Sequence, residues 1–289
     1  MRRLTVLLCV CGTLCAISGC SLEDAPLVGK PAATFDGHSI SMSDYRVRLK
    51  VEEDLYKGTR TEAQKQAAAI QSLVDEQLIA DEAARKGISV TDDEVNREID
   101  FQRTTYNKNV ALYRAQYPTR QAPPDFNQFL RSEGYDVGRL RDSVKHILLE
   151  QKLEHRQAQN RADAAYRSIQ SGTPIADAAR KYSDLPSASA GGQESVDSSH
   201  LSTTDARVQP AMNTLQPGDT SKVVEGSNGF YIIKLLTRDE NGITAVFVFV
   251  SAPAPQLYTP KFRPQWFRDF IRGMEDSSHV QYHVGPKAS

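Results

Sequence analysis

Two apolar segments, residues 230–236 and 243–250, constrain the fold more than any other feature of the chain. Both are rich in β-branched and aromatic side chains, which fit the pleated surface of a sheet. They are joined by Asp239-Glu240-Asn241-Gly242, and Asn-Gly readily adopts the positive φ angles of a tight hairpin turn. The segments therefore predict an antiparallel hairpin, and with it a β-sheet, in a chain whose other strong patterns are helical.

Helical periodicity dominates the first half of the chain. From Thr61 to Lys86, apolar residues recur at intervals of three and four while charged residues face the other way. Thr91 and Glu94 have the spacing of a capping box, which marks the start of a helix. Pro123-Pro124 excludes a helix from the loop around it, because proline lacks an N–H donor. After a hairpin over residues 32–40, we expect helices over residues 42–56, 61–86, 91–113, 125–133 and 136–157.

Shorter elements are expected in the second half. Small and polar residues from Ser183 to Thr204 predict a loop of about twenty residues with little regular structure, and such loops are usually functional or mobile. The tail is predicted to form an aromatic-rich helix after Pro260 and then a strand, since residues 279–284 alternate. The other expected elements are helices over residues 162–170, 175–182 and 207–215 and a strand over residues 222–224.

Composition and charge exclude several function classes. The 289 residues carry 35 basic and 36 acidic side chains, so no net field favours nucleic acid as a partner. The histidines show no metal-ligand spacing and no cysteine accompanies them. Neither a Gly-rich phosphate loop nor a Gly-x-Ser-x-Gly motif is present. We therefore expect no metal and no cofactor.

The first twenty residues have the organisation of a bacterial leader. A basic start is followed by an apolar run over residues 4–17, which is too short to span a bilayer as a stable helix. Ile17-Ser18-Gly19-Cys20 resembles the lipobox, in which the cysteine receives the lipid. We expect a signal peptide over residues 1–19, lipidation of Cys20 and a tether over residues 20–31, with a plain secretory signal as the alternative. Ser21 after the cysteine, by analogy with Gram-negative sorting, favours the outer membrane. All four cysteines lie in this segment: Cys9, Cys11, Cys15 and Cys20.

The stretch from Ile175 to Leu236 resembles a parvulin-type prolyl isomerase domain. A helix ending in Tyr182-Ser183 is followed by a Ser/Ala/Gly loop, then Leu215-x-x-Gly-Asp-x-Ser, then Gly229-Phe-Tyr-Ile-Ile-Lys-Leu. The resemblance implies a four-stranded antiparallel sheet with helices, here over residues 158–255. It also implies a shallow groove that binds the bond before proline.

The residues that would form a parvulin active site depart from the family pattern. The Cys or Asp position falls on Leu185, although Asp184 is adjacent, and the second histidine falls on Tyr231. The aromatic wall of the proline pocket falls near Val208. No His-Ile-Leu-Val strand precedes Ala162, because His146-Ile-Leu-Leu lies within a helical period. Residues 245–250 look able to fill that missing central strand from the other end of the domain, which would be a circularly permuted arrangement.

The flanking helical region is similar to the N-terminal domain of the SurA/PrsA family of extracytoplasmic chaperones. The resemblance covers residues 32–157, and Gly87-Ile-Ser-Val-Thr-Asp-Asp-Glu-Val is its most specific part. It implies a helical domain that holds unfolded clients, completed by a closing helix and strand from residues 256–289. The expected fold is therefore α+β: a discontinuous helical chaperone domain, 32–157 plus 256–289, with a degenerate parvulin-like domain inserted at 158–255.

Three functions stay open at this point. The favoured one is a lipid-anchored extracytoplasmic chaperone or foldase for unfolded exported proteins, with a weakly active or inactive parvulin-like domain. An active peptidyl-prolyl isomerase would use Asp184, Tyr231 and Ser183 as catalytic residues. A non-catalytic envelope-assembly lipoprotein is the third. The aromatic residues expected either to fill the helical core or to contact clients are Phe126, Phe129, Tyr113 and Tyr117. The sequence does not predict an oligomeric state.

Overall fold

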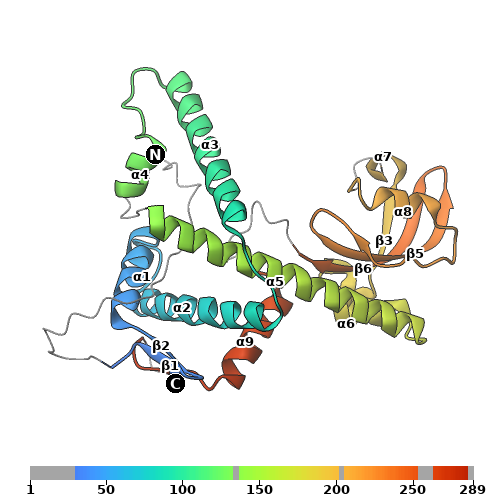
Figure 1. Ribbon diagram of the computed structural model, residues 1–289. Coiled ribbons are helices and arrows are strands. Elements are labelled where there is room, and N and C mark those ends of the chain that lie inside the picture. Colours follow the sequence, from blue (N-terminus) through green and yellow to red (C-terminus); the bar gives the residue numbers. More distant parts are fainter. Residues whose placement is uncertain (1–29, 133–136, 202–204, 253–262, 286–289) are drawn as a thin grey trace, which may run out of the picture. The chain divides into compact units, whose positions relative to one another are not determined.

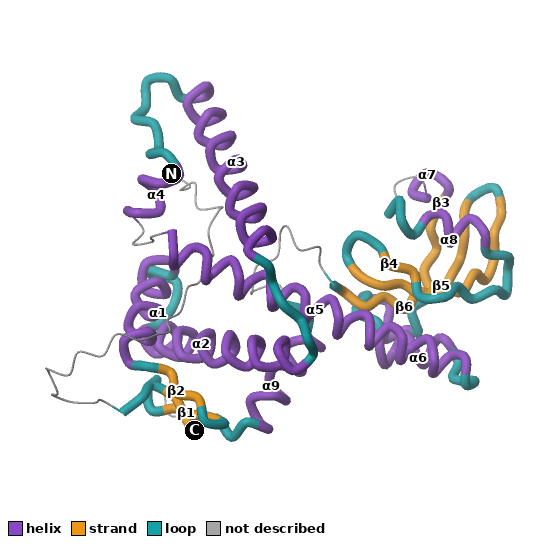
Figure 2. The backbone as a smooth tube through the Cα atoms, viewed as in Figure 1, coloured by secondary structure: helices purple, strands orange, loops and turns teal. Residues whose placement is uncertain are grey.

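The computed structural model describes residues 30–132, 137–201, 205–252 and 263–285 (Figure 1). Helices and antiparallel strands are both present, as the α+β prediction requires (Figure 2). The chain divides into two compact units, the first made of Met1–Glu150 with Asp269–Ser289 and the second of Gln151–Arg268. Two helices, α5 (Val137–Gln170) and α9 (Gln265–Ser277), contribute residues to both units.

A small sheet in the first unit joins the two ends of the described chain. β1 (Ala33–Phe35) and β2 (His38–Ile40) form the predicted hairpin, and Asp36 and Gly37 at its turn have φ angles of 42° and 81°. β7 (Gln281–Tyr282) pairs antiparallel with β1, which gives the strand order β2-β1-β7. The prediction that the tail strand lies beside the first hairpin is confirmed.

Helices form the rest of the first unit. Thr61 and Thr91 make the capping boxes that begin α2 and α3, each accepting a hydrogen bond from the main chain three residues later. One core cluster joins the small sheet to α1 and α2, and a second joins α3, α4 and α5. The helices entirely within this unit are α1 (Met42–Leu55), α2 (Glu62–Arg85), α3 (Asp92–Gln116) and α4 (Phe126–Ser132).

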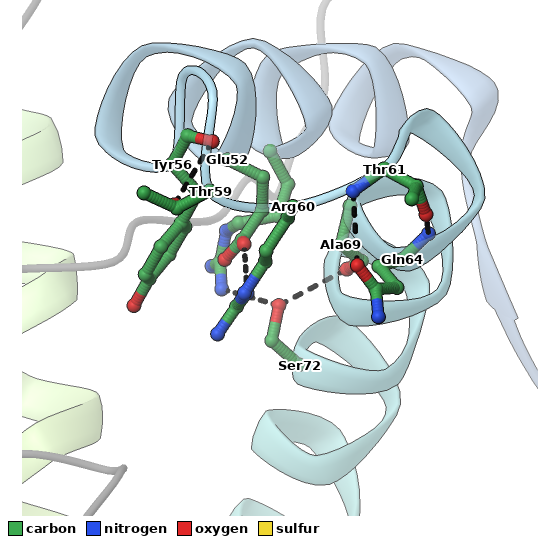
Figure 3. Close-up of polar contacts among 9 residues, drawn as sticks. Glu52, Tyr56, Thr59, Arg60, Thr61, Gln64, Ala69 and Ser72 are labelled. Atoms are coloured by element: carbon green, nitrogen blue, oxygen red, sulfur yellow. Dashed lines mark hydrogen bonds and ion pairs between the residues drawn. The ribbon is translucent and has the colours of Figure 1, made fainter.

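Charged side chains connect α1 to α2. Arg48 is only 2% exposed, donates to Ser72 Oγ at 2.7 Å and makes a two-pronged contact with the Glu76 carboxylate at 2.8 and 3.0 Å. Glu52 pairs with Arg60 from the connecting loop at 2.6 Å, and Figure 3 shows this pair beside Ser72. Burial raises the pKa of Glu52, and the charges of Arg60 and Arg48 only partly offset it.

The prediction of two separate helices over residues 136–157 and 162–170 is wrong, because α5 runs unbroken through both. No glycine or proline interrupts residues 157–162. Ala158, Ala162 and Ala165 are fully buried at helical spacing. Helix propagation adds a hydrogen bond for each residue fixed, so a helix without a breaker and with a buried face continues.

The second unit contains a four-stranded antiparallel sheet in the order β3-β6-β5-β4. β5 (Gly229–Asp239) and β6 (Gly242–Ser251) form the predicted hairpin, and β4 is Val224–Glu225. β6 lies between β5 and β3, so the segment predicted to fill the missing central strand does so. α6 (Ile175–Tyr182) and part of α5 pack on one face of the sheet, and α8 (Gln209–Thr214) packs on the other.

The predicted irregular loop over residues 183–204 is wrong for most of its length. It contains a 3₁₀ helix, η1 (Pro186–Ala190), then β3 (Gln193–Asp197) and α7 (Ser198–Leu201). Gly191 and Gly192 have φ angles of 92° and 74° and turn the chain between η1 and β3. The polar sequence of β3 has low strand propensity, and pairing with β6 overrides it.

Candidate functional site

The positions that match the parvulin active site meet on the face of the sheet covered by α8. Tyr231 on β5 lies directly opposite Phe249 on β6, with ring centroids 4.6 Å apart and planes inclined by 37°. Leu185 and Tyr231 are partly buried against a core cluster that contains Val208, Met212 and Ile233. Leu185, Val208 and Tyr231, the positions to which the family motif points, therefore lie in one cluster, and their side chains are apolar or aromatic.

Phe249 stands on the strand that completes the sheet from its C-terminal side. Its residue type means that β6 brings an apolar ring, rather than an imidazole, against Tyr231. Among the described residues of this cluster, the Tyr231 hydroxyl is the polar group that corresponds in position to a catalytic side chain. A neutral hydroxyl donates one hydrogen bond, whereas a histidine pair can both donate and accept and can carry charge.

Asp205 is a polar neighbour of this site that the sequence analysis missed. Its carboxylate accepts hydrogen bonds from the main-chain N–H of Arg207 at 3.0 Å, from the Ser227 hydroxyl at 3.2 Å and from the Ser227 main chain. Desolvation would raise the pKa of Asp205, but these hydrogen bonds together outweigh it and lower the pKa. Burial raises the pKa of Tyr231, and the negative charge of Asp205 raises it further. The phenol therefore stays neutral at pH 7.

Gly226 allows these groups to approach one another. A Cβ atom at this position would lie 2.7 Å from Tyr231 Cε2, 2.8 Å from Asp205 Oδ2 and 3.0 Å from Val208 Cγ2. Any side chain would therefore push the ring, the carboxylate or the pocket wall away. The signal in the sequence was an aspartate four residues before the short helix α8, but its partner Ser227 comes from a distant loop.

Ser183 and Asp184, two of the residues predicted to be catalytic, lie at the junction of α6 with β6. Ser183 Oγ accepts from Phe249 N at 3.0 Å and from Leu185 N at 3.4 Å. Asp184 N donates to Phe249 O at 2.7 Å, and its carboxylate accepts from Ser251 N at 2.8 Å. Burial raises the pKa of Asp184, opposed by the Ser251 hydrogen bond and the Arg161 charge. Both side chains fix the main chain of β6 to the end of α6.

The aromatic residues predicted as client contacts fall into two groups in the first unit. Phe126 is 2% exposed and, with Phe129, packs around Tyr106 at centroid distances of 5.7 and 5.1 Å, which attaches α4 to α3. Tyr113 and Tyr117 form a separate tilted pair at 5.0 Å, with partial solvent exposure. Phe126 therefore serves the core, and the other three keep some accessible surface.

α3 also carries large apolar side chains in solvent that the sequence analysis did not single out. Phe101 is 45% exposed and Leu112 is 59% exposed. Residues eleven positions apart are separated by about 20° around an α-helix, so both side chains lie on one face. The spacing of Phe101 and Leu112 in the sequence could have predicted this face. It was overlooked because more of the apolar residues of α3 lie on the face that packs against the core.

The described residues contain neither a metal-binding cluster nor a membrane-spanning helix. No group of three or more histidine, cysteine, aspartate or glutamate side chains in the described ranges could hold a metal ion. No helix there is long and apolar enough to cross a membrane. Cys20, the predicted lipidation site, lies outside the described residues.

Comparison with known proteins finds relatives of both the helical N-terminal region and the parvulin-like region. A family model described as the SurA-like N-terminal domain matches residues 5–154, and one described as the PPIC-type PPIASE domain matches residues 146–237. The chain is 34% identical over 148 residues to "Chaperone SurA" of Burkholderia lata, covering 49% of this chain and 31% of that protein. It is 35% identical over 144 residues to "Chaperone SurA" of Burkholderia pseudomallei, covering 48% of this chain and 30% of that protein.

The chain thus spans less than a third of the length of these curated relatives. Among solved structures, the peptidylprolyl isomerase PrsA of Bacillus anthracis is 13% identical, with 74% of this chain and 99% of that chain covered. Its TM-score of 0.24 is too low to support an argument about the fold. Because the SurA-like N-terminal model alone covers just over half of the sequence, the chain belongs to the SurA/PrsA-type family of parvulin chaperones.

Proposed function

We propose that this protein is a lipid-anchored extracytoplasmic chaperone that binds unfolded exported polypeptides. One observation supports the proposal most: the sheet has four strands, and the motif positions Leu185 and Tyr231 lie in an apolar and aromatic cluster beside Phe249. A fold that is kept without its catalytic side chains is expected to serve binding. The match to proteins named "Chaperone SurA" supports the same function.

The parvulin-like unit is proposed to be weakly active or inactive. The barrier to rotation about a peptide bond is about 18–20 kcal/mol. Enzymes lower such barriers with preorganised polar groups directed at the transition state. The aromatic pair and Leu185 provide apolar contact instead, which suits the retention of an extended peptide.

The second candidate function is prolyl isomerisation by a reduced set of residues, and the partly exposed Tyr231 hydroxyl beside Asp205 favours it. A protease-coupled assay on a Xaa-Pro peptide distinguishes the two. We expect a rate close to the uncatalysed background, unchanged in Tyr231→Phe and Asp184→Ala. Turnover well above background that falls in either variant would establish an isomerase, because it would assign chemistry to these groups.

Client binding is proposed to use the large apolar side chains that the first unit exposes to solvent, two of them on one face of α3. The proposed contacts are Phe101, Leu112, Tyr113, Tyr117 and Phe129. The protein without its leader should slow aggregation of an unfolded exported protein diluted from urea. Phe101→Ser with Leu112→Ser should at least double the amount of chaperone needed.

Val47→Ser is the matched control, because Val47 is 42% exposed on a different helix. It should leave the aggregation assay unchanged. If the unmodified protein has no effect at several-fold molar excess, the chaperone proposal fails and an envelope-assembly role without client binding becomes the better reading. If Val47→Ser weakens the suppression of aggregation as much as the α3 variant does, the proposed binding surface on α3 is rejected, but the chaperone function is not.

Anchoring through Cys20 and a preference for the outer membrane belong to the same proposal. More than one acyl chain is needed for durable attachment to a bilayer, and a lipidated N-terminal cysteine meets that need. Expression of Cys20→Ala should release the protein from the membrane fraction. Continued membrane association of this variant would reject the lipobox and leave a plain signal peptide.

A further inference from the structure

The sheet of the second unit ends in a strand with one open side. β3 pairs with β6 along all five of its residues, from Gln193 opposite Val246 to Asp197 opposite Gly242. Within the described residues it has no partner strand on its other side. The opposite edge of the sheet, β4, is only two residues long. β3 is therefore the longer accessible edge of this sheet.

The alternation of an antiparallel ladder identifies the groups that face outward. Gly192 O accepts from Phe247 N, and Ser198 N donates to Asn241 O, each at 2.8 Å. Every second residue of β3 turns its main-chain groups toward β6. Glu194 and Val196 lie between Gly192 and Ser198 at this spacing, so their N–H and C=O groups face β6. The N–H and C=O groups of Gln193 and Ser195 and the N–H of Asp197 consequently point away from the sheet, while the Asp197 C=O lies at the start of α7. None of these outward groups takes part in the main-chain hydrogen bonds of the described turns, loops and caps.

β3 carries two acidic side chains, Glu194 and Asp197, but lacks three other features that protect edge strands. Such edges commonly carry lysine, proline or a bulge, which prevent another strand from pairing. Gln193-Glu-Ser-Val-Asp197 contains no lysine or proline, and its register with β6 is continuous. On one face, the small side chains of Ser195 and Thr244 hydrogen-bond each other at 3.1 Å.

The other face of β3 offers apolar surface beside the edge. Val196 and Leu201 are only partly buried against the cluster that contains Val208 and Ile243. An apolar side chain on a strand beside β3 would cover both of them and extend this cluster. In a paired strand, alternate side chains point to the same face, so residues at every second position would make that contact.

We propose that the outer edge of β3 binds an extended segment of the client by strand addition, a proposal that rests on the chaperone function proposed above. Main-chain groups at fixed spacing recognise an extended polypeptide without regard to most of its sequence. Glu194 and Asp197 at the edge favour neutral or basic segments. The fitting client stretch has β-branched or aromatic residues at alternate positions and few acidic ones.

A pair of variants at Ser195 tests the edge. Its N–H points outward, so Ser195→Pro removes a donor from the free edge without removing one from the ladder with β6. Ser195→Ala keeps the N–H and loses only the contact with Thr244. We expect Ser195→Pro to weaken binding of an unfolded β-barrel protein about three- to tenfold, the amount expected for one hydrogen bond. Ser195→Ala should bind as the unmodified protein does.

A second measurement leaves the protein unaltered. A ten-residue peptide of alternating valine and threonine with a terminal lysine should slow exchange of the Gln193, Ser195 and Asp197 amide hydrogens. The same peptide N-methylated at every residue lacks main-chain donors on both of its edges and should not slow the exchange. Slowed exchange by both peptides, or by neither, would overturn strand addition even if Ser195→Pro fails to fold.

These outcomes separate the two proposals. If the unmodified protein does not slow aggregation, the chaperone function fails. If it does, and Ser195→Pro is folded and equally effective, only the edge proposal is rejected. Sedimentation at increasing concentration tests for a second copy of the chain. A dimer that Ser195→Pro abolishes would assign the edge to self-association and overturn client binding there.

Discussion

Replacing Arg48 by methionine should destabilise the first unit strongly. The guanidinium is 2% exposed, donates to Ser72 and holds both oxygens of Glu76, whose side chain is 15% exposed. Methionine fills much of the volume of the aliphatic stem but leaves the Glu76 carboxylate without this partner. Removal of one member of a buried ion pair typically costs 3–5 kcal/mol, because the remaining charge stays desolvated. We expect about 3 kcal/mol here, since Glu76 keeps some contact with water.

Urea unfolding, followed by far-ultraviolet circular dichroism, measures the loss, and hydrogen exchange locates it in α1 and α2. Arg272→Met is the matched control, because Arg272 is 64% exposed in its pair with Asp269 and should cost less than about 1 kcal/mol. Combining Arg48→Met with Glu76→Met also removes the desolvated Glu76 charge and should recover part of the loss. If Arg48→Met costs no more than Arg272→Met, the ion pair does not hold α1 to α2 and the reasoning is refuted.

Three further perturbations have defined outcomes. Gly192→Ala should lower the urea midpoint by more than Gly218→Ala, because a Cβ would lie 2.4 Å from Phe247 O at Gly192 and in open space at Gly218, although both have positive φ. Thr61→Ala should cost about 1 kcal/mol in the same assay through loss of the α2 cap, and no change would refute the capping-box argument. Glu52→Gln should stabilise the protein at pH 7 but not at pH 4. The raised pKa means that the folded state favours the neutral form of Glu52. Ionised Glu52 therefore destabilises the folded protein, and this cost grows as the pH rises from the pKa of an unfolded glutamate through the higher pKa of folded Glu52. An equal effect of Glu52→Gln at both pH values would contradict this.

The sequence predicted those elements whose own residues determine their conformation. Asp36-Gly37 and Asn241-Gly242 specify turns, and Thr61 and Thr91 specify helix starts, because each acts on the adjacent main chain. The central place of β6 was also predictable. Its apolar residues alternate between two covered faces, which only an interior strand provides.

The elements that were missed depend on distant residues. β3 is polar and becomes a strand because β6 presents a complementary edge to it. The link between residues 157 and 162 is helical because Ala158 and Ala162 pack against the second unit's core, which local propensity does not reveal. For the candidate site, the matching positions Leu185, Val208 and Tyr231 could be found from the motif. The anchoring roles of Ser183 and Asp184 could not, since both depend on the register of β6.

The pairing of β7 with β1 has a consequence for how the chain is made. Thr34 on the first hairpin contacts His283, and 249 positions separate the two in sequence. During synthesis from the N-terminal end, β1 cannot pair with β7 until residues 281–282 have been made. Contacts between such distant residues carry a large loop-closure cost and slow folding. The first unit is therefore expected to finish folding only after the second has been synthesised, and a chain that stops before residue 281 would leave β1 paired with β2 alone.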